Sequence, residues 1–336
     1  MSNVRRHFRY QATIAMHLEP VDQYGQYLSA QRRELITEAE EFRLHDVNEL
    51  LSELLNKVFD ARSDALYVFY VLNHRIDFMG WLLESLMESQ DPRLKHDYKF
   101  RAKEDQKFTP PKAKESSTIA PLILGLYQRI DDYLVEINTV VSSSIEGKIF
   151  LYPQPIADAF NSQTYVTNLN SLAQSGVLPA KVLQLMIEKL NLYATVLGRL
   201  KTAFHTISRS EYWERYALNL SAGGLSFISD AAHPGFALFS KLHVFMAIES
   251  QVMVCSGKVV TVKKIELTQN DKPLNDKPVN DKVASDKNAH LLMHQSGLSG
   301  CKVSIEFEFL TTAQQQGIEL FLQRKELRDA MATVAL

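Results

Sequence analysis

The chain has 336 residues, 46% of them hydrophobic and 23% charged, which is typical of a soluble globular protein with about two structural units. A formal net charge of −2 argues against a polyelectrolyte that binds DNA or RNA through overall basic charge, so any basic function must be local. Apolar runs stay short of the roughly 20 residues of a membrane-spanning helix, and no signal-peptide block follows the N-terminal arginines. We therefore expect a cytoplasmic protein without a membrane span.

A basic cluster, Arg5-Arg6-His7-Phe8-Arg9, lies at the start of the chain and leads into a loosely alternating segment over residues 9–20. Alternation that ends at Pro20 predicts one β-strand. Residues 1–20 are therefore expected to form an arginine arm and a first strand. Taken alone, such an arm is more often a solvated tail than a binding element.

The pattern changes over residues 28–206, where four segments repeat apolar residues at three-four spacing. This spacing places each set on one helix face, so we expect a helical bundle. Apolar seams that remain exposed seek partners, which leads us to expect a homo-oligomer formed through the helices. The four sets are Leu44, Val47, Leu51, Leu54 and Val58; Phe69, Leu72, Ile76, Met79, Leu83 and Leu86; Ile119, Ile123, Leu126, Ile130, Tyr133, Ile137 and Val140; and Leu183, Met186, Leu190, Tyr193, Leu197, Leu200 and Phe204.

Two further segments of this region are predicted from composition. Residues 90–117 are polar and contain Pro110-Pro111, which predicts a linker rather than a continuous helix. Residues 153–172 are expected to form a shorter helix before Gly176.

Residues 208–332 return to strand-like patterns that predict a small antiparallel barrel. A polar region with a near-repeat of Asn-Asp-Lys-Pro, residues 269–288, is interpreted as a mobile loop between the last two strands. A final amphipathic helix, residues 311–331, is expected to bury Ile318, Phe321, Leu322 and Leu327. The five strand-like runs are YWERYALNL, GGLSFIS, LHVFMAIES, QVMVCSGKVVTVKKIEL and GCKVSIEFEFL.

Two cysteines, Cys255 and Cys301, fall in these strand-like runs. Their small number fits a reducing compartment, and a thiol in a strand packs as a small apolar group. We expect both to be core residues, with a disulfide across the sheet as the alternative.

A polar, glycine-rich turn, Asn219-Leu220-Ser221-Ala222-Gly223-Gly224, joins the first two strand-like runs after residue 208. Its short polar side chains can hydrogen-bond a ligand, and glycine lets a ligand approach the backbone because it has no Cβ. The arginines of the arm supply planar forks that match phosphate oxygens and the O6/N7 edge of guanine. Together the arm and the turn indicate a site for a doubly charged nucleotide, although such a turn alone is often only a hairpin.

The sequence resembles the PilZ domain family of bacterial receptors for cyclic di-GMP. Arg5 to Arg9 match the RxxxR motif of that family, and residues 219–224 match its [D/N]xSxxG motif, with Asn at the first position. The resemblance covers about 1–20 and 208–330, and about 200 residues separate two motifs that usually lie a few tens of residues apart. Further matches are Gly257-Lys258-Val259-Val260, Val303-Ser304-Ile305-Glu306-Phe307 and the helix start Thr311-Thr312-Ala313-Gln314.

The resemblance implies an α+β fold, in which an α-helical bundle interrupts a small antiparallel PilZ-like β-barrel with a C-terminal helix. It implies a receptor rather than an enzyme, with cyclic di-GMP as ligand and no other cofactor. The change on binding would pass through the helical region to an unidentified protein partner and regulate motility, surface attachment or biofilm formation. The implied site residues are Arg5 and Arg9 for phosphate and guanine, Arg6 as an auxiliary, Asn219 and Ser221 for guanine edges or the turn, and Gly223 and Gly224 for close backbone approach.

Other functions have weaker support in the residues. His290 and His294 have the spacing of a metal pair near Cys301, but further ligands are lacking and we expect no metal. His74 lies on a predicted helix without the neighbours of a phosphotransfer motif, so a structural role is expected. The alternative to a receptor is a scaffold whose barrel binds no ligand and whose helices assemble a complex.

Overall fold

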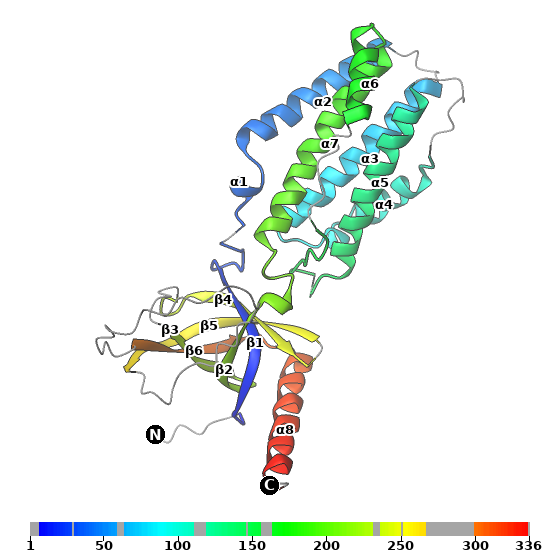
Figure 1. Cartoon of the computed structure of the whole chain (residues 1–336). Coiled ribbons are helices and arrows are strands. Elements are labelled where there is room, and N and C mark those ends of the chain that lie inside the picture. Colours follow the sequence, from blue (N-terminus) through cyan, green and yellow to red (C-terminus); the bar gives the residue numbers. More distant parts are fainter. Residues whose placement is uncertain are drawn as a thin grey trace, which may run out of the picture. The chain divides into compact units, whose positions relative to one another are not determined.

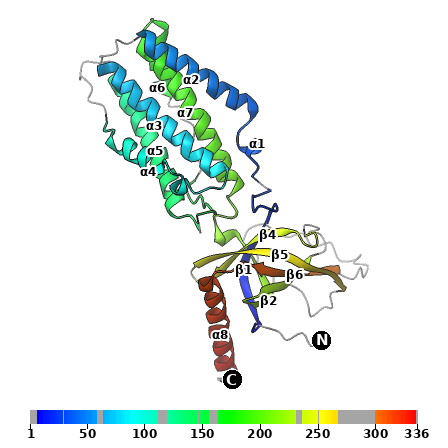
Figure 2. The ribbon, with the colours of Figure 1, turned by 180° about the vertical axis from the view of Figure 1, so that it is seen from behind.

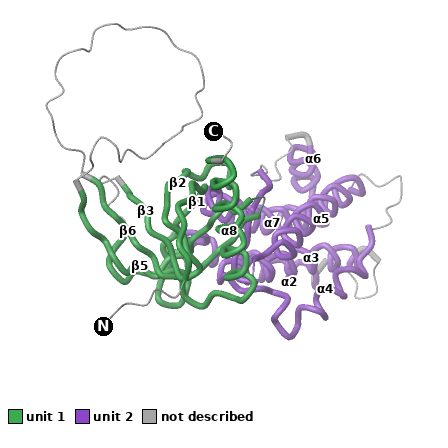
Figure 3. Tube along the Cα trace, turned by 90° about the horizontal axis from the view of Figure 1, so that it is seen from below, with its two compact units in different colours: residues 1–29, 209–336 green, residues 30–208 purple. Residues whose placement is uncertain are grey.

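The chain folds into two compact units, and Figure 3 colours them separately. The first unit combines residues 1–29 with residues 209–336, and the second consists of residues 30–208. The computed structural model describes residues 7–28, 30–58, 64–110, 119–145, 147–155, 163–230, 236–249, 251–266 and 299–334. Within these residues the fold is α+β, with one antiparallel barrel and eight α-helices, as the sequence predicts at this level.

Six antiparallel strands close the barrel in the order β1-β2-β3-β6-β5-β4 (Figure 1). The first strand comes from the N-terminal segment, and the other five come from the part of the chain after the helices. The N-terminal strand therefore completes a sheet whose other strands follow it by about 200 residues. The strands are β1 (Tyr10–Val21), β2 (Glu214–Ser221), β3 (Gly224–Asp230), β4 (Lys241–Ile248), β5 (Gln251–Glu266) and β6 (Ser299–Glu308).

The barrel interior is filled by the alternate apolar residues of each strand. On β1, for example, Ala12, Ile14 and Met16 are buried while Gln11 and Thr13 between them are exposed. This alternation of period two is what the sequence shows, and it fixes which face of each strand points inward. The same interior cluster includes Leu218, Leu220, Leu225, Phe227, Leu242, Val244, Met246, Ile248, Cys255, Val259, Val303, Ile305 and Phe307.

Helix α8 (Thr312–Val334) packs on the barrel with one face. It begins with a capping box, in which the Thr311 hydroxyl accepts the Gln314 N–H and the Gln314 side chain accepts the Thr311 N–H. Ile318 and Leu322 are buried as predicted. The prediction for Leu327 is wrong, because its side chain lies on the opposite side of the helix and is 62% exposed.

The second unit is built around four long helices that bury the predicted seams against one another (Figure 2). Val47 of α2, Ile76 of α3, Ile130 of α5 and Leu190 of α7 are fully buried. The four helices therefore bury these seams against one another within one chain, and the seams supply no apolar face for self-association. Self-association through the helices stays a prediction. The helices are α1 (Arg32–Leu35), α2 (Glu38–Val58), α3 (Asp64–Met87), α4 (Tyr98–Lys107), α5 (Ala120–Ser142), α6 (Gln163–Gln174) and α7 (Leu178–Ala203).

The predicted linker over residues 90–117 contains two helical segments that the sequence pattern does not reveal. They are the 3₁₀ turn η1 (Pro92–Leu94) and the ten-residue helix α4. Helix α4 buries none of its residues, so it lacks the apolar periodicity that identifies a helix in a sequence. Ion pairs hold it instead, including Asp105 with the buried Arg75 of α3, whose Nε lies 2.9 Å from the Asp105 Oδ1.

The three residues considered for other chemistry have ordinary surroundings. His74 is half-buried, and its ring lies against the rings of Tyr70 and Phe108, as expected for a structural histidine. Cys255 is buried and Cys301 half-buried, and the two are not joined by a disulfide. Their cross-strand partners are other residues, so the sheet does not bring the two thiols together.

Candidate functional site

The arm lies against the glycine-rich hairpin that follows β2. Strands β1 and β2 pair from Tyr10 opposite Leu220 to Met16 opposite Glu214. The same register, continued towards the N-terminus, places Arg9 opposite Ser221 and His7 opposite Gly223. A contact confirms that position, since a Cβ built on Gly223 would lie 2.8 Å from the Cδ2 atom of His7.

The structure therefore brings together one arginine of the predicted arm and the predicted turn. Arg9 is exposed at the start of β1, on the same side of the extended chain as Gln11 two residues later. Arg5 and Arg6 lie outside the described residues. The two sequence motifs are thus neighbours in space despite the helical unit between them in the chain.

The hairpin is fixed by its own hydrogen bonds and by strand β6. Ser221 is 1% exposed, and its hydroxyl donates a hydrogen bond to the Gly224 carbonyl oxygen at 3.0 Å. The Phe307 N–H of β6 donates to the Gly223 carbonyl oxygen at 3.1 Å. These bonds give Ser221 a role in the turn, which was one of the two roles that the sequence left open for it.

Gly224 has a packing reason that involves no ligand. Its φ of +148° lies in a region that residues with a Cβ rarely adopt, and a Cβ there would stand 2.2 Å from the Ile305 carbonyl oxygen. The close approach that this glycine permits is therefore the approach of β6. Gly223 in turn makes room for His7.

A row of uncharged polar side chains crosses the outer face of the barrel next to the hairpin. Gln11 of β1 pairs with Asn219 of β2, Asn219 pairs with Ser226 of β3, and Ser226 pairs with Ser304 of β6. Gln11 and Asn219 are exposed and the two serines half-buried. We call these four residues the polar row; it spans three strand spacings, about 14 Å.

The sequence identified Asn219 but missed the other three residues of the polar row. Their only sequence signal is their place at outward positions of predicted strands, a place that many polar residues share. They become neighbours only once the strand register is known. Amide and hydroxyl groups in this arrangement can donate to and accept from the edge of a planar polar ligand, with the Arg9 guanidinium at one end of the row.

The base of the arm is also tied to helix α8. The Tyr10 hydroxyl donates a hydrogen bond to Asp329 at 3.0 Å, and the Phe8 ring stacks on the Tyr10 ring at 6.2 Å between centroids. Asp329 also pairs with Lys325 at 2.7 Å. The Lys325 ammonium and the Tyr10 hydroxyl lower the pKa of Asp329, and the bond to Asp329 raises the pKa of Tyr10.

This contact predicts a dependence of stability on acid. Because the pKa of Asp329 is lowered in the folded state, its stabilising contribution is present at neutral pH and is lost as the pH falls below the usual 3.8. We expect the difference in unfolding free energy between the unchanged chain and Asp329→Asn to shrink between pH 7 and pH 3. Urea unfolding at both pH values measures it, and a difference that grows in acid would contradict the assignment.

A second group of contacts lies where the chain leaves and re-enters the barrel. The His17 ring of β1 stacks on Trp213, just before β2, and both rings lie against Phe245 of β4. Tyr27, beyond the end of β1, lies against His243 of β4. Both connections to the helical unit are therefore anchored on the same strand of the barrel.

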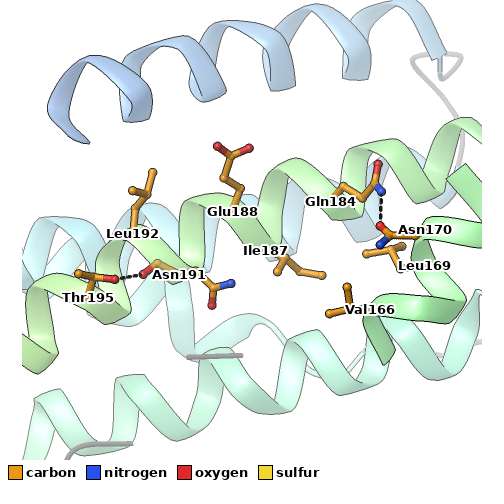
Figure 4. A pocket seen from close by; sticks show the side chains of 9 residues that line it. All are labelled: Val166, Leu169, Asn170, Gln184, Ile187, Glu188, Asn191, Leu192 and Thr195. Atoms are coloured by element: carbon orange, nitrogen blue, oxygen red, sulfur yellow. Dashed lines mark hydrogen bonds between the residues drawn. The ribbon is translucent and has the colours of Figure 1, made fainter. Parts of the chain in front are cut away.

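A separate hollow of about 450 Å³ lies on the helical unit beside α6 and α7 (Figure 4). Its floor is apolar, with Leu169 and Ile187 buried. Two of its polar residues are bonded to each other, Gln184 to Asn170 at 2.8 Å, and its one charged residue, Glu188, pairs with Arg43 at 2.5 Å. The hollow contains none of the residues that the sequence assigns to a site.

Comparisons with known proteins give no assignment. No family model matches the chain, and no curated protein and no solved structure matches it. In the described part of the chain, no helix is long and apolar enough to cross a membrane, and no group of three or more His, Cys, Asp or Glu residues could hold a metal ion. His290, His294 and the predicted loop over residues 269–288 lie outside that part.

Proposed function

We propose that the barrel is a receptor for cyclic di-GMP, and that the ligand binds on its outer face between the arm and the hairpin. In this proposal Arg9, together with Arg5 and Arg6, binds phosphate and guanine, and Asn219 binds a guanine edge. The chain would act as a signalling effector in bacteria rather than as an enzyme.

The placement of the arm on the hairpin carries the proposal. Two motifs that only have meaning as a pair lie about 200 residues apart in the sequence, and β1 pairing together with the His7–Gly223 contact brings them side by side. A solvated tail, which is the ordinary interpretation of an arginine-rich N-terminus, has no reason to follow the register of the hairpin.

The chemistry of the surface also suits this ligand. A guanidinium binds phosphate oxygens through two parallel hydrogen bonds and stacks on a purine face, and both groups occur twice in cyclic di-GMP. The polar row itself offers uncharged hydrogen-bond donors and acceptors, and the exposed carboxylate of Glu306 on β6 lies beside it, opposite Gly224. Its length of about 14 Å leaves room for more than one base.

Connectivity supports a route for the signal. Strand β1, which begins directly after Arg9, leads into the helical unit, and β2, which carries Asn219, follows it. A ligand that contacts both the arm and the hairpin therefore acts on the two strands that flank the helical unit in the chain. In the proposal this change reaches a protein partner or a second copy through the helices and regulates motility or biofilm formation.

Calorimetric titration of the full chain with cyclic di-GMP, GTP and cyclic AMP tests the proposed selectivity. The proposal predicts saturable binding of cyclic di-GMP and weak or no binding of the other two nucleotides. Absence of binding for all three would leave the scaffold alternative, in which the barrel has only an architectural role.

Replacement of Arg9 should weaken binding selectively. A charge-assisted hydrogen bond contributes about 1.5–3 kcal/mol, so Arg9→Ala is expected to raise the Kd for cyclic di-GMP about 10- to 100-fold. Arg215→Ala is the matched control. Arg215 is exposed like Arg9, but it lies on β2 four residues, about 13 Å, from Asn219 and so outside the proposed site. Equal effects of the two variants would show that only overall charge matters.

A further inference from the structure

We infer that His7 is a positioning residue that docks the arm on the hairpin by occupying the space that Gly223 leaves open. The docking itself follows from the contacts below, and its effect on ligand affinity rests on the proposed function. Taken alone, the arginine-rich segment is interpreted as a solvated tail; in the structure its last residues lie on the hairpin.

A side chain at position 223 would meet the ring of His7. A Cβ on residue 223 would stand 2.8 Å from Cδ2 and 3.6 Å from Nε2 of the His7 ring. The distance of 2.8 Å is shorter than real Cβ atoms show to other atoms. The φ of Gly223 is not among the positive values, so its backbone conformation does not demand glycine. The exposed His7 ring is therefore the neighbour that a side chain at this position would displace.

The hairpin cannot move away from the ring without a loss elsewhere. The Gly223 carbonyl accepts the Phe307 N–H from β6, and the neighbouring Ser221 hydroxyl is bonded to the Gly224 carbonyl. The turn that receives His7 is thus a fixed surface. A ring that packs on a fixed surface restricts the chain to which it belongs.

Arg9 lies between two such attachments. On its N-terminal side His7 packs on Gly223, and on its C-terminal side Tyr10 is held by pairing with Leu220 and by its bond to Asp329. The intervening backbone has little freedom, so the guanidinium starts from the outer face of the hairpin. Ligand binding to an arginine that the fold already holds in position costs less conformational entropy than binding that must first order a free arm.

Three variants test this inference: His7→Ala, Gly223→Ala and the double variant. The first readout is the rate of tryptic cleavage after Arg9 in the ligand-free protein, each rate divided by that of the same variant unfolded in urea. We expect His7→Ala and Gly223→Ala each to accelerate cleavage about threefold or more, and the double variant to be no faster than the single ones, because both changes remove one contact. His45→Ala, which removes a histidine that is exposed on α2, is the control and should leave the rate unchanged.

The second readout is affinity for cyclic di-GMP. We expect His7→Ala to weaken binding about threefold to tenfold while Arg9 is still present, and His7→Gln, which restores a planar polar group, to recover part of the loss. Because His7 is exposed, its replacement should leave the urea midpoint of unfolding unchanged. The His7→Ala measurements therefore stay interpretable even if Gly223→Ala folds poorly.

The outcomes separate the two proposals. Unchanged cleavage in His7→Ala, or additive acceleration in the double variant, would overturn the docking role. Accelerated cleavage in a protein that binds no cyclic di-GMP would keep the docking role and reject the receptor.

Discussion

Gly224→Ala is expected to lower the free energy of unfolding of the barrel by about 3 kcal/mol or more. A Cβ at this position would stand 2.2 Å from the Ile305 carbonyl oxygen, so strands β3 and β6 must separate locally. The φ of +148° adds backbone strain, which costs on the order of 1–3 kcal/mol for a residue with a side chain. Urea unfolding followed through tryptophan fluorescence, to which Trp213 of the barrel unit and Trp81 of the helical unit both contribute, measures the loss.

Gly25→Ala provides the control for this experiment. Gly25 also has a positive φ, +86°, but nothing lies within 4 Å of the place where its Cβ would stand. We expect it to cost about 1 kcal/mol, the strain without the clash. Equal losses for the two variants would mean that the contact between the hairpin and β6 does not constrain the turn.

Asp77→Ala is expected to lower the free energy of unfolding of the helical unit by about 2–3 kcal/mol. Lys189 of α7 has a fully buried side chain, and its ammonium pairs with Asp77 and bonds to Asn73, both on α3. Removal of Asp77 leaves the buried Lys189 ammonium with Asn73 as its remaining partner. An uncompensated buried charge destabilises the folded state more than replacement of that charge by an apolar side chain. Asp77 itself is about half-exposed, so the loss should fall at the low end for buried pairs.

The opposite replacement should behave differently. Lys189→Met substitutes an apolar chain of similar size and leaves Asp77 in contact with water, so we expect a change within about 1 kcal/mol. Urea unfolding of both variants tests the asymmetry. A larger loss for Lys189→Met than for Asp77→Ala would contradict this description of the pair.

The pH dependence of Asp77→Ala provides a second check. Burial lowers the pKa of Lys189 below its usual 10.5, and Asp77 opposes that shift. Without Asp77 the pKa falls further, so between that lowered value and 10.5 the unfolded chain binds more protons than the folded one. Stability of the variant must then rise with pH over this window, and the difference from the unchanged chain should shrink between pH 7 and pH 10.

The sequence predicts the fold well where periodicity is strong. Four seams and five strand-like runs correspond to α2, α3, α5, α7 and β2 to β6, because burial of one face imposes a pattern on the residues. Helix α4 is missed for the same reason, since it buries no residue and is held by ion pairs that depend on α3. Leu327 is misplaced because its side chain lies on the side of α8 that faces away from the barrel, although the helix still contacts the barrel at Asp329.

The candidate site is predictable only in its motifs. Arg9, Asn219 and Ser221 can be named from the sequence, but the hydroxyl of Ser221 is bonded inside the turn, and the two glycines face Ile305 and His7. The contacts of the two glycines depend on β6 and on the arm, which are remote in sequence. The polar row likewise requires the register of four strands, which alternation within each strand does not supply.

Titration of cyclic di-GMP against Arg9→Lys is the most direct measurement of whether arm and hairpin form one nucleotide site. Lysine keeps the charge but lacks the planar fork, so a guanidinium that binds phosphate or guanine on the hairpin predicts a Kd raised at least about tenfold, with Arg215→Lys unchanged. Binding that is undiminished in Arg9→Lys, or no binding by the unchanged chain, would contradict it.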